Sequence, residues 1–371
     1  MIREEIDNII YLSGCVLKGE KADIDRISNM DLEALYNASK RQSMAAIVGK
    51  ALQDAGVKNE AFEQALAKSV RKNVLLKREL KTITDAFEKN HIWYLPLKGC
   101  IMMDYYPSVG LRQMSDIDIL VDSSCTKLIK SIMTDLGYET VSFNRGAHDI
   151  YHKKPIYYIE IHRSLIPERK ELSVIEEYYK NLIGILKQTD SEYRKELSKE
   201  DFYIFMIAHA YKHYIGSGTG LRSLMDIYVY LSKFEKSMDM IYVSKELKKL
   251  EISNFEETIK KLSFNLYERK RRPDEEKEML KYIYSSGTYG TMEHGYRNRL
   301  KRNEGRKLSY VLKRVFVTGE TVKNYYPFFY KYPIFLPVLW IYRILRTIFV
   351  RRKKIKKELQ FLLREKKNND R

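Results

Sequence analysis

The spacing of hydrophobic residues divides the chain into regions with different periods. In residues 1–90, apolar side chains recur every three or four positions, which predicts amphipathic helices with one face in a core. Helical sequence is expected to open at Asp31, a capping residue, and to continue to Gly56. A second long helix is expected over 59–90. Its apolar positions are Phe62, Leu66, Val70, Leu76, Leu80 and Ile83.

The period shortens in residues 91–170. Short alternating or continuous apolar runs predict β-strands, and helical segments lie between them. The expected strands are 92–97, 116–119, 138–143 and 155–163, and the expected helices are 100–106 and 125–136. This mixture predicts an α+β fold with a small mixed β-sheet core flanked by helices.

Helical spacing returns in residues 171–325, which we expect to form a mainly helical C-terminal domain. The segment from Ser198 to Asp201 has the pattern of a helix N-terminus, and the helix should run to about Ile215. Residues 326–371 form an aromatic and basic tail.

The charge of the chain predicts an anionic partner. Its 371 residues include 67 Lys and Arg against 49 Asp and Glu, which gives a formal charge of +18. Hydrophobic residues make up 44% and charged residues 31%, which is typical of a globular protein. Nucleotides, nucleic acids and anionic lipids all fit this charge.

Cysteine usage and the N-terminal residues favour a reducing compartment. Cys15, Cys100 and Cys125 share no metal-ligand spacing and do not suggest a disulfide framework. The first residues are too acidic for a signal peptide. The best uncharged run, 332–342, has 11 residues, whereas a spanning helix needs about 20. We therefore expect a cytoplasmic protein.

Two aspartates one residue apart are the most informative feature of the sequence. Asp116 and Asp118 alternate with Ile117 and Ile119, so a strand would place both carboxylates on one face. Adjacent like charges repel, and a divalent cation would relieve that repulsion. Oxygen ligands at this spacing suit Mg²⁺. The alternative is a solvated polar face on an edge strand, and we favour metal binding for the pair.

A site with two metal ions needs a third carboxylate, and Glu160 is the best candidate. It shares a strand face with His162 in the alternating segment 158–162. If that strand pairs beside the strand of Asp116, Glu160 completes a cluster of three carboxylates. A solvated polar face remains the alternative for Glu160.

Lys98 and Gly99 form a predicted turn between a strand and a helix, 17 residues before Asp116. A glycine at such a turn lets backbone N–H groups approach phosphate oxygens, and the helix N-terminus adds positive potential. Lys98 and Arg112 are candidate ligands of a triphosphate. The alternative for each is an ordinary surface cation.

The order of these motifs resembles the uncharacterised nucleotidyltransferase family of bacteria, a branch of the DNA polymerase β-like nucleotidyltransferase superfamily. The matching segments are Leu97-Lys98-Gly99, Tyr106-Pro107, Leu111-Arg112, Met114 to Val121 and Ile159 to His162. The resemblance implies a nucleotidyltransferase core, two Mg²⁺ ions and transfer of a nucleoside monophosphate from an NTP, ATP among them. Asp116, Asp118 and Glu160 fall at the positions of the superfamily's metal-binding carboxylates.

The resemblance also implies a nucleotide pocket and one departure from the superfamily pattern. The expected nucleotide-binding residues are Lys98, Gly99, Arg112, Ser115, His213 and Arg222. The wider superfamily has Gly followed by Gly or Ser, whereas Cys100 follows Gly99 in this chain. The cysteine removes a hydroxyl or a second small residue from the phosphate turn.

Two pairs in the helical domain have a spacing of four residues. His209 and His213 could bind zinc at this spacing, but no third ligand stands out, and we favour a structural pair at a helix surface. Arg222 and Asp226 are close enough to pair on a helix. The resemblance suggests that His213, Arg222 and Asp226 line the acceptor or nucleotide pocket.

The C-terminal tail holds much of the positive charge. Residues 341–371 contain 12 Lys and Arg and 3 Asp and Glu. On a helix, we expect an apolar stripe formed by Ile341, Leu345, Ile348 and Phe349. We expect a basic side formed by Arg343, Arg346, Lys354 and Lys357. Such a helix suits an anionic membrane surface. The alternatives are packing of the stripe on the domain and, less favoured, nucleic acid binding.

Together these patterns predict a Mg²⁺-dependent nucleotidyltransferase that moves a nucleoside monophosphate from an NTP to a hydroxyl of a small molecule, a saccharide or a protein. We expect four regions: 1–90 helical, 91–170 catalytic, 171–325 helical and 326–371 the tail. The alternative is a catalytically silent nucleotide- or partner-binding module docked at an anionic membrane surface. Peripheral association with the inner membrane face would fit either function.

Overall fold

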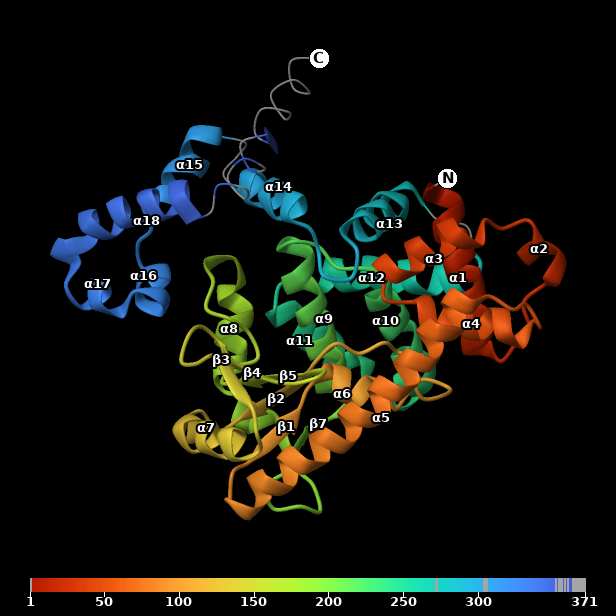
Figure 1. The fold of residues 1–371 in the computed structure, drawn as a ribbon, viewed down its shortest axis with the longest axis horizontal. Helices are drawn as coiled ribbons and strands as arrows, with labels where there is room; N and C mark the ends of the chain where they lie inside the picture. Colours follow the sequence, from red (N-terminus) through yellow and green to blue (C-terminus); the bar gives the residue numbers. More distant parts are fainter. Residues whose placement is uncertain are drawn as a thin grey trace. The chain divides into compact units, whose positions relative to one another are not determined.

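The computed structural model describes residues 2–270, 273–302 and 306–350, together with 352, 356, 358, 360 and 361 (Figure 1). The chain forms two compact units. The first comprises residues 1–211 and 220–288, and the second comprises residues 212–219 and 289–371.

The first unit opens with helices, as the sequence predicts. They are α1 (Ile2–Lys18), α2 (Ile24–Ser28), α3 (Leu32–Arg41), α4 (Ala45–Asp54) and α5 (Glu60–Lys89). Asp31 caps α3 as expected, because its side chain accepts hydrogen bonds from the first backbone N–H groups. The helix expected to reach Gly56 is interrupted between α3 and α4. Ser43 has a φ of 52° there, and the Gln42 side chain bonds distant backbone groups.

A five-stranded mixed sheet forms the α/β core, in the order β1-β2-β5-β4-β3. The strands are β1 (Tyr94–Pro96), β2 (Ile117–Val121), β3 (Glu139–Ser142), β4 (His148–Lys153) and β5 (Tyr157–His162). The pair β2 and β5 is parallel, and the other neighbouring pairs are antiparallel. The strand β4 has no counterpart among the predicted strands, because polar residues fill most of its six positions.

One face of this sheet is packed and the opposite face is polar. Ile117, Ile119, Ile159 and Ile161 belong to a buried cluster that also contains residues of α5 and of α7 (Thr126–Asp135). In Figure 1 these two helices lie along that side of the sheet. Since strand side chains alternate, the intervening residues of β2 and β5 project from the other face.

The long helix α5 also holds the loop that leads into β2. Ser69 donates a 2.6 Å hydrogen bond to the carbonyl of Gly110, and Asn73 donates a 3.0 Å hydrogen bond to that of Arg112. Gly110 has a φ of +90°, and a Cβ there would lie 2.7 Å from the backbone nitrogen of Val70. Both its dihedral angle and this close approach require glycine.

Further helices and a short β-hairpin complete the first unit. They are α6 (Lys98–Met102), α8 (Ser173–Lys180), α9 (Lys199–Ile215), α10 (Leu221–Phe234), α11 (Met240–Lys249), α12 (Ser253–Tyr267) and α13 (Asp274–Ser286), with β6 (Leu186–Gln188) and β7 (Lys195–Leu197). Ser198 accepts a hydrogen bond from the backbone N–H of Asp201, which confirms the predicted capping pattern of α9. The predicted α+β fold with a small mixed sheet is confirmed.

The second unit contains the helices α14 (Met292–Arg302), α15 (Lys307–Val315), α16 (Glu320–Tyr325), α17 (Pro327–Lys331) and α18 (Leu336–Val350). Val317, Val322 and Leu339 form one buried cluster in this unit. Among the described residues, no helix is both long enough and apolar enough to cross a membrane.

Candidate active site

Two neighbouring strands bring the predicted carboxylates together. In the parallel pair of β2 and β5, Asp118 lies directly opposite Glu160, and Leu120 lies opposite His162. Asp116 immediately precedes β2. The expected pairing of the Glu160 strand beside the aspartate strand is therefore present, on the face of the sheet away from α5 and α7.

The carboxylates repel one another in this arrangement. Burial and the charge of Asp118 raise the pKa of Asp116, and Glu160 adds to this effect. The hydroxyl of Ser115 opposes it by donating a 2.7 Å hydrogen bond to Oδ1 of Asp116. Arg222 is near enough to lower the same pKa. The site thus holds negative charge that a cation would stabilise.

Two histidines flank Glu160. His162 Nε2 lies 3.0 Å from Oδ1 of Asp118 and 3.5 Å from Oε2 of Glu160, and His148 Nε2 lies 3.5 Å from the same Glu160 oxygen. Burial disfavours the charged imidazole of His162, but hydrogen bonds to the two carboxylates outweigh burial and raise its pKa to about 9. Within the described ranges, His148, Glu160 and His162 are the group of three whose ligand atoms all lie within 4.8 Å of one another.

The predicted phosphate turn is the first turn of the short helix α6. Lys98 and Gly99 begin that helix, and Leu97 precedes it. The backbone N–H of Cys100 already donates to the carbonyl of Leu97, at 2.9 Å. The Cys100 thiol is buried, 3.9 Å from the carbonyl of Asp118, and burial raises its pKa to about 12. Cys100 therefore packs under β2 and does not present a polar group at the turn.

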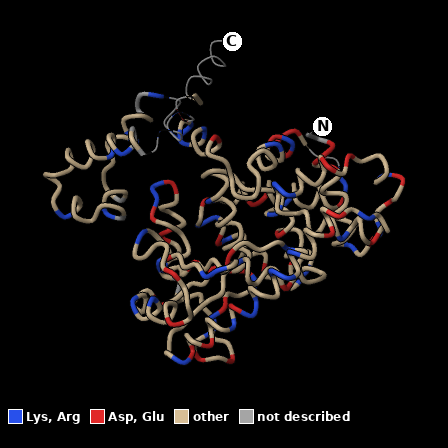
Figure 2. Tube along the Cα trace, viewed as in Figure 1, with Lys and Arg blue, Asp and Glu red and all other residues tan. Residues whose placement is uncertain are grey.

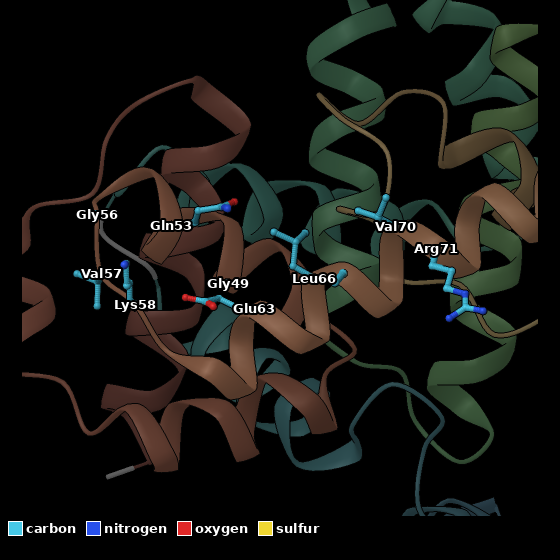
Figure 3. A pocket seen from close by; sticks show the side chains of 10 residues that line it. Gly49, Gln53, Gly56, Val57, Lys58, Glu63, Leu66, Val70 and Arg71 are labelled. Atoms are coloured by element: carbon cyan, nitrogen blue, oxygen red, sulfur yellow. The ribbon is translucent and has the colours of Figure 1, made fainter.

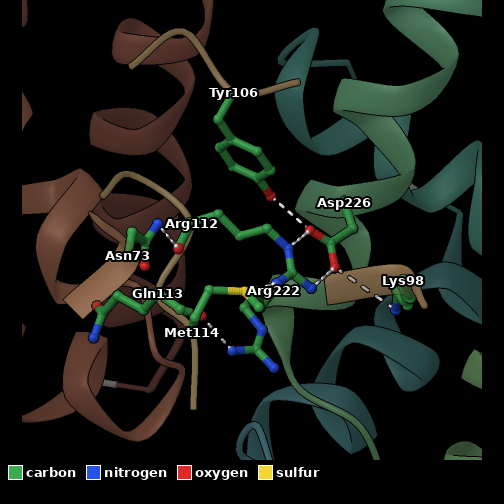
Figure 4. A network of polar contacts seen from close by, with 8 residues as sticks. All are labelled: Asn73, Lys98, Tyr106, Arg112, Gln113, Met114, Arg222 and Asp226. Atoms are coloured by element: carbon green, nitrogen blue, oxygen red, sulfur yellow. Dashed lines mark hydrogen bonds and ion pairs between the residues drawn. The ribbon is translucent and has the colours of Figure 1, made fainter. Parts of the chain in front are cut away.

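Asp226 of α10 is the centre of a buried polar network (Figure 4). Arg112 binds both of its carboxylate oxygens, with Nε 2.8 Å from Oδ1 and Nη2 2.9 Å from Oδ2. Tyr106 donates a hydrogen bond of 2.8 Å to Oδ1, and Lys98 Nζ lies 3.6 Å from Oδ2. The side chains of Arg112 and Asp226 are only 4% and 1% exposed.

This network changes the environment of two predicted phosphate ligands. Burial would raise the pKa of Asp226, but the charges of Arg112 and Lys98 hold it well below the usual range. Burial lowers the pKa of Lys98 to about 8, although Asp226 acts in the opposite direction. In this structure the Arg112 guanidinium binds Asp226 and is not a surface cation. A direct contact of Arg112 with phosphate stays a prediction.

The remaining predicted ligands come from different parts of the chain. Arg222 donates a 2.8 Å hydrogen bond to the carbonyl of Gln113, and Lys72 donates a 3.0 Å hydrogen bond to that of Ser115. Both bonds tie the segment just before Asp116 to helices. His213 belongs to the end of α9 that is part of the second compact unit. Its role, like that of His209, stays a prediction.

An open groove of about 690 Å³ lies elsewhere in the first unit, between α4 and α5 (Figure 3). Its lining includes the apolar residues Val57, Leu66 and Val70 and the basic residues Lys58 and Arg71. The groove contains none of the predicted site residues. We therefore do not assign it to the active site.

Sequence reasoning missed two parts of the site. His148 lies in β4, a segment that the sequence did not predict to be a strand. Once β4 is known to pair with β5, the register places His148 opposite His162 and on the same face as Glu160. The bond of Asp226 to Arg112 spans 114 residues. The spacing of Arg222 and Asp226 marked Asp226 as notable, but no local pattern could identify Arg112 as its partner.

Comparisons with known proteins agree with the fold and the motifs. The sequence model for an uncharacterised nucleotidyltransferase family matches residues 28–267, which is more than half of the chain. The protein is thus an enzyme of the nucleotidyltransferase class, which transfers phosphorus-containing groups. It belongs to the uncharacterised nucleotidyltransferase family, so the resemblance inferred from the motifs is confirmed.

Two solved structures are weakly similar to this chain. The lincosamide antibiotic adenylyltransferase LnuA, solved with lincomycin bound, has 19% identity and a TM-score of 0.28, covering 42% of this chain and 96% of that chain. An antigenic nucleotidyltransferase-like protein from Paracoccidioides brasiliensis has 13% identity and a TM-score of 0.31, covering 56% of this chain and 95% of that chain. No curated protein matches the sequence.

Proposed function

We propose that this nucleotidyltransferase moves a nucleoside monophosphate from an NTP to a hydroxyl of a small molecule, a saccharide or a protein, with two Mg²⁺ ions held by Asp116, Asp118 and Glu160. One observation carries the proposal. Asp118 and Glu160 lie side by side on neighbouring strands, and Asp116 is two positions before Asp118.

The residues of the cluster fit divalent cations. Carboxylate oxygens are the ligands that Mg²⁺ prefers, and the raised pKa of Asp116 reflects repulsion that a cation would remove. The opposite face of β2 and β5 packs into the buried core, so the strands that carry the three carboxylates are fixed in position. We infer that these three carboxylates, rather than a solvated edge, are the catalytic residues.

Each residue has a proposed role in the transfer. Bound Mg²⁺ supplies charge neutralisation of the triphosphate and lowers the pKa of the acceptor hydroxyl. Asp116 and Asp118 would hold the ions and, through them, orient the phosphates, and Glu160 assists removal of the acceptor proton. Lys98, Gly99 and Arg222 contact phosphate oxygens, with Ser115 fixing the orientation of Asp116. Arg112 contributes by holding Asp226 and the segment before β2 in place.

Labelled NTP incorporation tests this function. The full chain is incubated with each NTP labelled at the α-phosphate, Mg²⁺ and cell extract, and labelled products are separated. We expect Asp118→Asn to lower incorporation at least about a hundredfold, because it removes a carboxylate ligand of the proposed Mg²⁺ ions, whose positive charge would stabilise the transition state. Asp85→Asn is the matched control, since Asp85 is an exposed residue of α5 that pairs with Lys81. Equal incorporation by the parent and Asp118→Asn would refute the proposal.

We further propose that the second unit docks on an anionic membrane surface. Of the predicted apolar stripe, Ile341, Leu345 and Phe349 are 59%, 48% and 65% exposed. The side of α18 that packs contains Leu339 and Trp340 instead. The side chain of Ile348, and the residues Lys354 and Lys357, lie outside the described part of the chain.

Further exposed aromatic residues lie in α16, in α17 and in the segment between α17 and α18. They are Tyr325, Phe328, Tyr330, Tyr332 and Phe335. Residues 306–350 contain eight Lys and Arg but only one acidic residue, Glu320 (Figure 2). Aromatic and aliphatic side chains combined with excess positive charge suit the interface of an anionic bilayer. Binding to the phosphate backbone of nucleic acid alone would need the charges and not the exposed apolar groups.

Vesicle cosedimentation distinguishes these surfaces. We expect the full chain to sediment with phosphatidylglycerol-containing vesicles and not with pure phosphatidylcholine vesicles. The double variant Ile341→Ser/Phe349→Ser should lose sedimentation, while Ile241→Ser, which changes an 84% exposed residue of the first unit, should not. Equal recovery of parent and double variant would refute membrane docking. Binding to duplex DNA that the double variant retains, without vesicle binding, would point to nucleic acid.

A further inference from the structure

A second set of possible metal ligands lies beside the three carboxylates. His148 of β4 and Glu160 and His162 of β5 project from the same face of two antiparallel neighbours. His148 is directly opposite His162, and Glu160 is two residues from His162 on the same strand. Cross-strand and i, i+2 neighbours on one face are close enough to share a ligand.

The distances in this group match those of a coordinated ion. Ligands at about 2.0–2.1 Å from a tetrahedral ion lie about 3.3–3.4 Å from one another. Nε2 of His148 and Nε2 of His162 are each 3.5 Å from Oε2 of Glu160, and the three residues each offer a ligand atom within 4.8 Å of the other two. Both nitrogen–oxygen distances are therefore close to the spacing of ligands around one ion.

The donor atoms favour a different ion from the one proposed for the carboxylates. Mg²⁺ is bound by oxygen, whereas imidazole nitrogen suits zinc and other transition metals. Two histidines and one glutamate, with a fourth position open, form a known ligand set for Zn²⁺. The side chains of His148 and Glu160 are 34% and 30% exposed, so an ion can reach them from solvent.

We propose that His148, Glu160 and His162 form a binding site for a divalent transition-metal ion such as Zn²⁺. Ion binding exchanges the hydrogen bond between His162 Nε2 and Asp118 for a coordinate bond from the same nitrogen, and the proton on that nitrogen is released to solvent. The bound ion also engages Glu160. If the proposed function holds, Zn²⁺ therefore competes with Mg²⁺ for that carboxylate and slows transfer.

Metal titration of the full chain tests the site without relying on activity. Metal-free protein is titrated with Zn²⁺ alone against a chromophoric chelator, and Co²⁺ is added to a second sample to record its visible absorption bands. We expect one Zn²⁺ per chain and Co²⁺ bands typical of nitrogen and oxygen ligation. His148→Ala should weaken Zn²⁺ binding at least about tenfold and remove the Co²⁺ bands.

Two further variants separate this inference from the proposed function. His152→Ala is the matched control, because His152 lies on the same strand but packs against Tyr158, with ring centroids 4.3 Å apart. It should bind Zn²⁺ like the parent. Asp116→Asn should keep Zn²⁺ binding even though it loses the proposed Mg²⁺-dependent incorporation. The site would be overturned if the parent did not bind Zn²⁺, or if His148→Ala bound Zn²⁺ as tightly as the parent. Either result would leave the transferase proposal standing.

Discussion

Replacing Asp226 by alanine should destabilise the first unit strongly. The substitution removes the carboxylate that binds Arg112 at two atoms and also accepts a hydrogen bond from Tyr106. It leaves the Arg112 guanidinium buried, with its side chain only 4% exposed, and without this counter-ion. Lys98 loses its 3.6 Å ion pair in the same step.

The size of the effect follows from burial. Breaking a buried ion pair by removing one partner costs about 3–5 kcal/mol, because the other charge stays desolvated. An exposed pair is worth about 0.2–1 kcal/mol, since water screens both charges. The pair of Lys81 and Asp85, with side chains 75% and 54% exposed, supplies that comparison on α5. We expect Asp226→Ala to cost several times more than Asp85→Ala.

Tryptophan fluorescence can follow the first unit by itself. The chain has two tryptophans, Trp93 beside β1 and Trp340 in α18. In a Trp340→Phe background, Trp93 reports urea unfolding of the first unit only. The free energy of unfolding is then compared among the parent, Asp226→Ala, Asp85→Ala and the double variant Arg112→Met/Asp226→Leu.

The double variant decides whether the unpaired charge is the cause. Replacing both partners of a buried ion pair with apolar residues is often neutral or stabilising. The double variant should therefore recover much of the stability that Asp226→Ala loses. A loss below about 1 kcal/mol for Asp226→Ala, similar to that of Asp85→Ala, would refute the assignment of Asp226 as the anchor of this network.

Three other properties can be predicted. The folded pKa of Asp226 lies below its ordinary value of 3.8, so the stability that this carboxylate contributes is complete above pH 3.8 and is lost as pH falls further. Below about pH 4, the urea midpoint of the parent should therefore fall more steeply than that of Asp226→Ala. Parallel curves for the two proteins would contradict this. Gly110→Ala should cost more than Gly19→Ala in urea unfolding, because both glycines have positive φ but only Gly110 has backbone atoms within 3 Å of the added Cβ; equal costs would show that the loop moves aside. Since burial raises the pKa of Cys100 to about 12, a thiol reagent at pH 8 should modify the partly exposed Cys125 and leave Cys100 intact in the folded protein, as peptide mapping would show.

The sheet and the helices of the first unit were predictable where one local period dominates. Ile117 and Ile119, and likewise Ile159 and Ile161, alternate with polar residues, and this pattern located the two strands that carry the carboxylates. The caps at Asp31 and Ser198 were equally visible, because capping depends on neighbouring residues.

Features set by distant contacts were not predictable in the same way. No glycine or proline marks the interruption after Arg41, where the side chain of Gln42 bonds the carbonyl of Tyr284 and the N–H of Leu221. The sequence marks Lys98 and Arg112 as triphosphate ligands or, alternatively, as surface cations, and both are buried against Asp226. Burial and partner choice depend on the assembled fold, and a single sequence does not encode them in a local pattern.

The pairing of Arg112 with Asp226 also bears on the order in which the protein is made. Ribosomes synthesise the carboxylate strand and its basic neighbours more than a hundred residues before Asp226. Until α10 has emerged, Arg112 and Lys98 lack the anion that they bind in the folded protein. Closing so long a loop costs chain entropy that local helices do not incur. The sheet can form early during synthesis, but its cationic flank is completed only after α10 has left the ribosome.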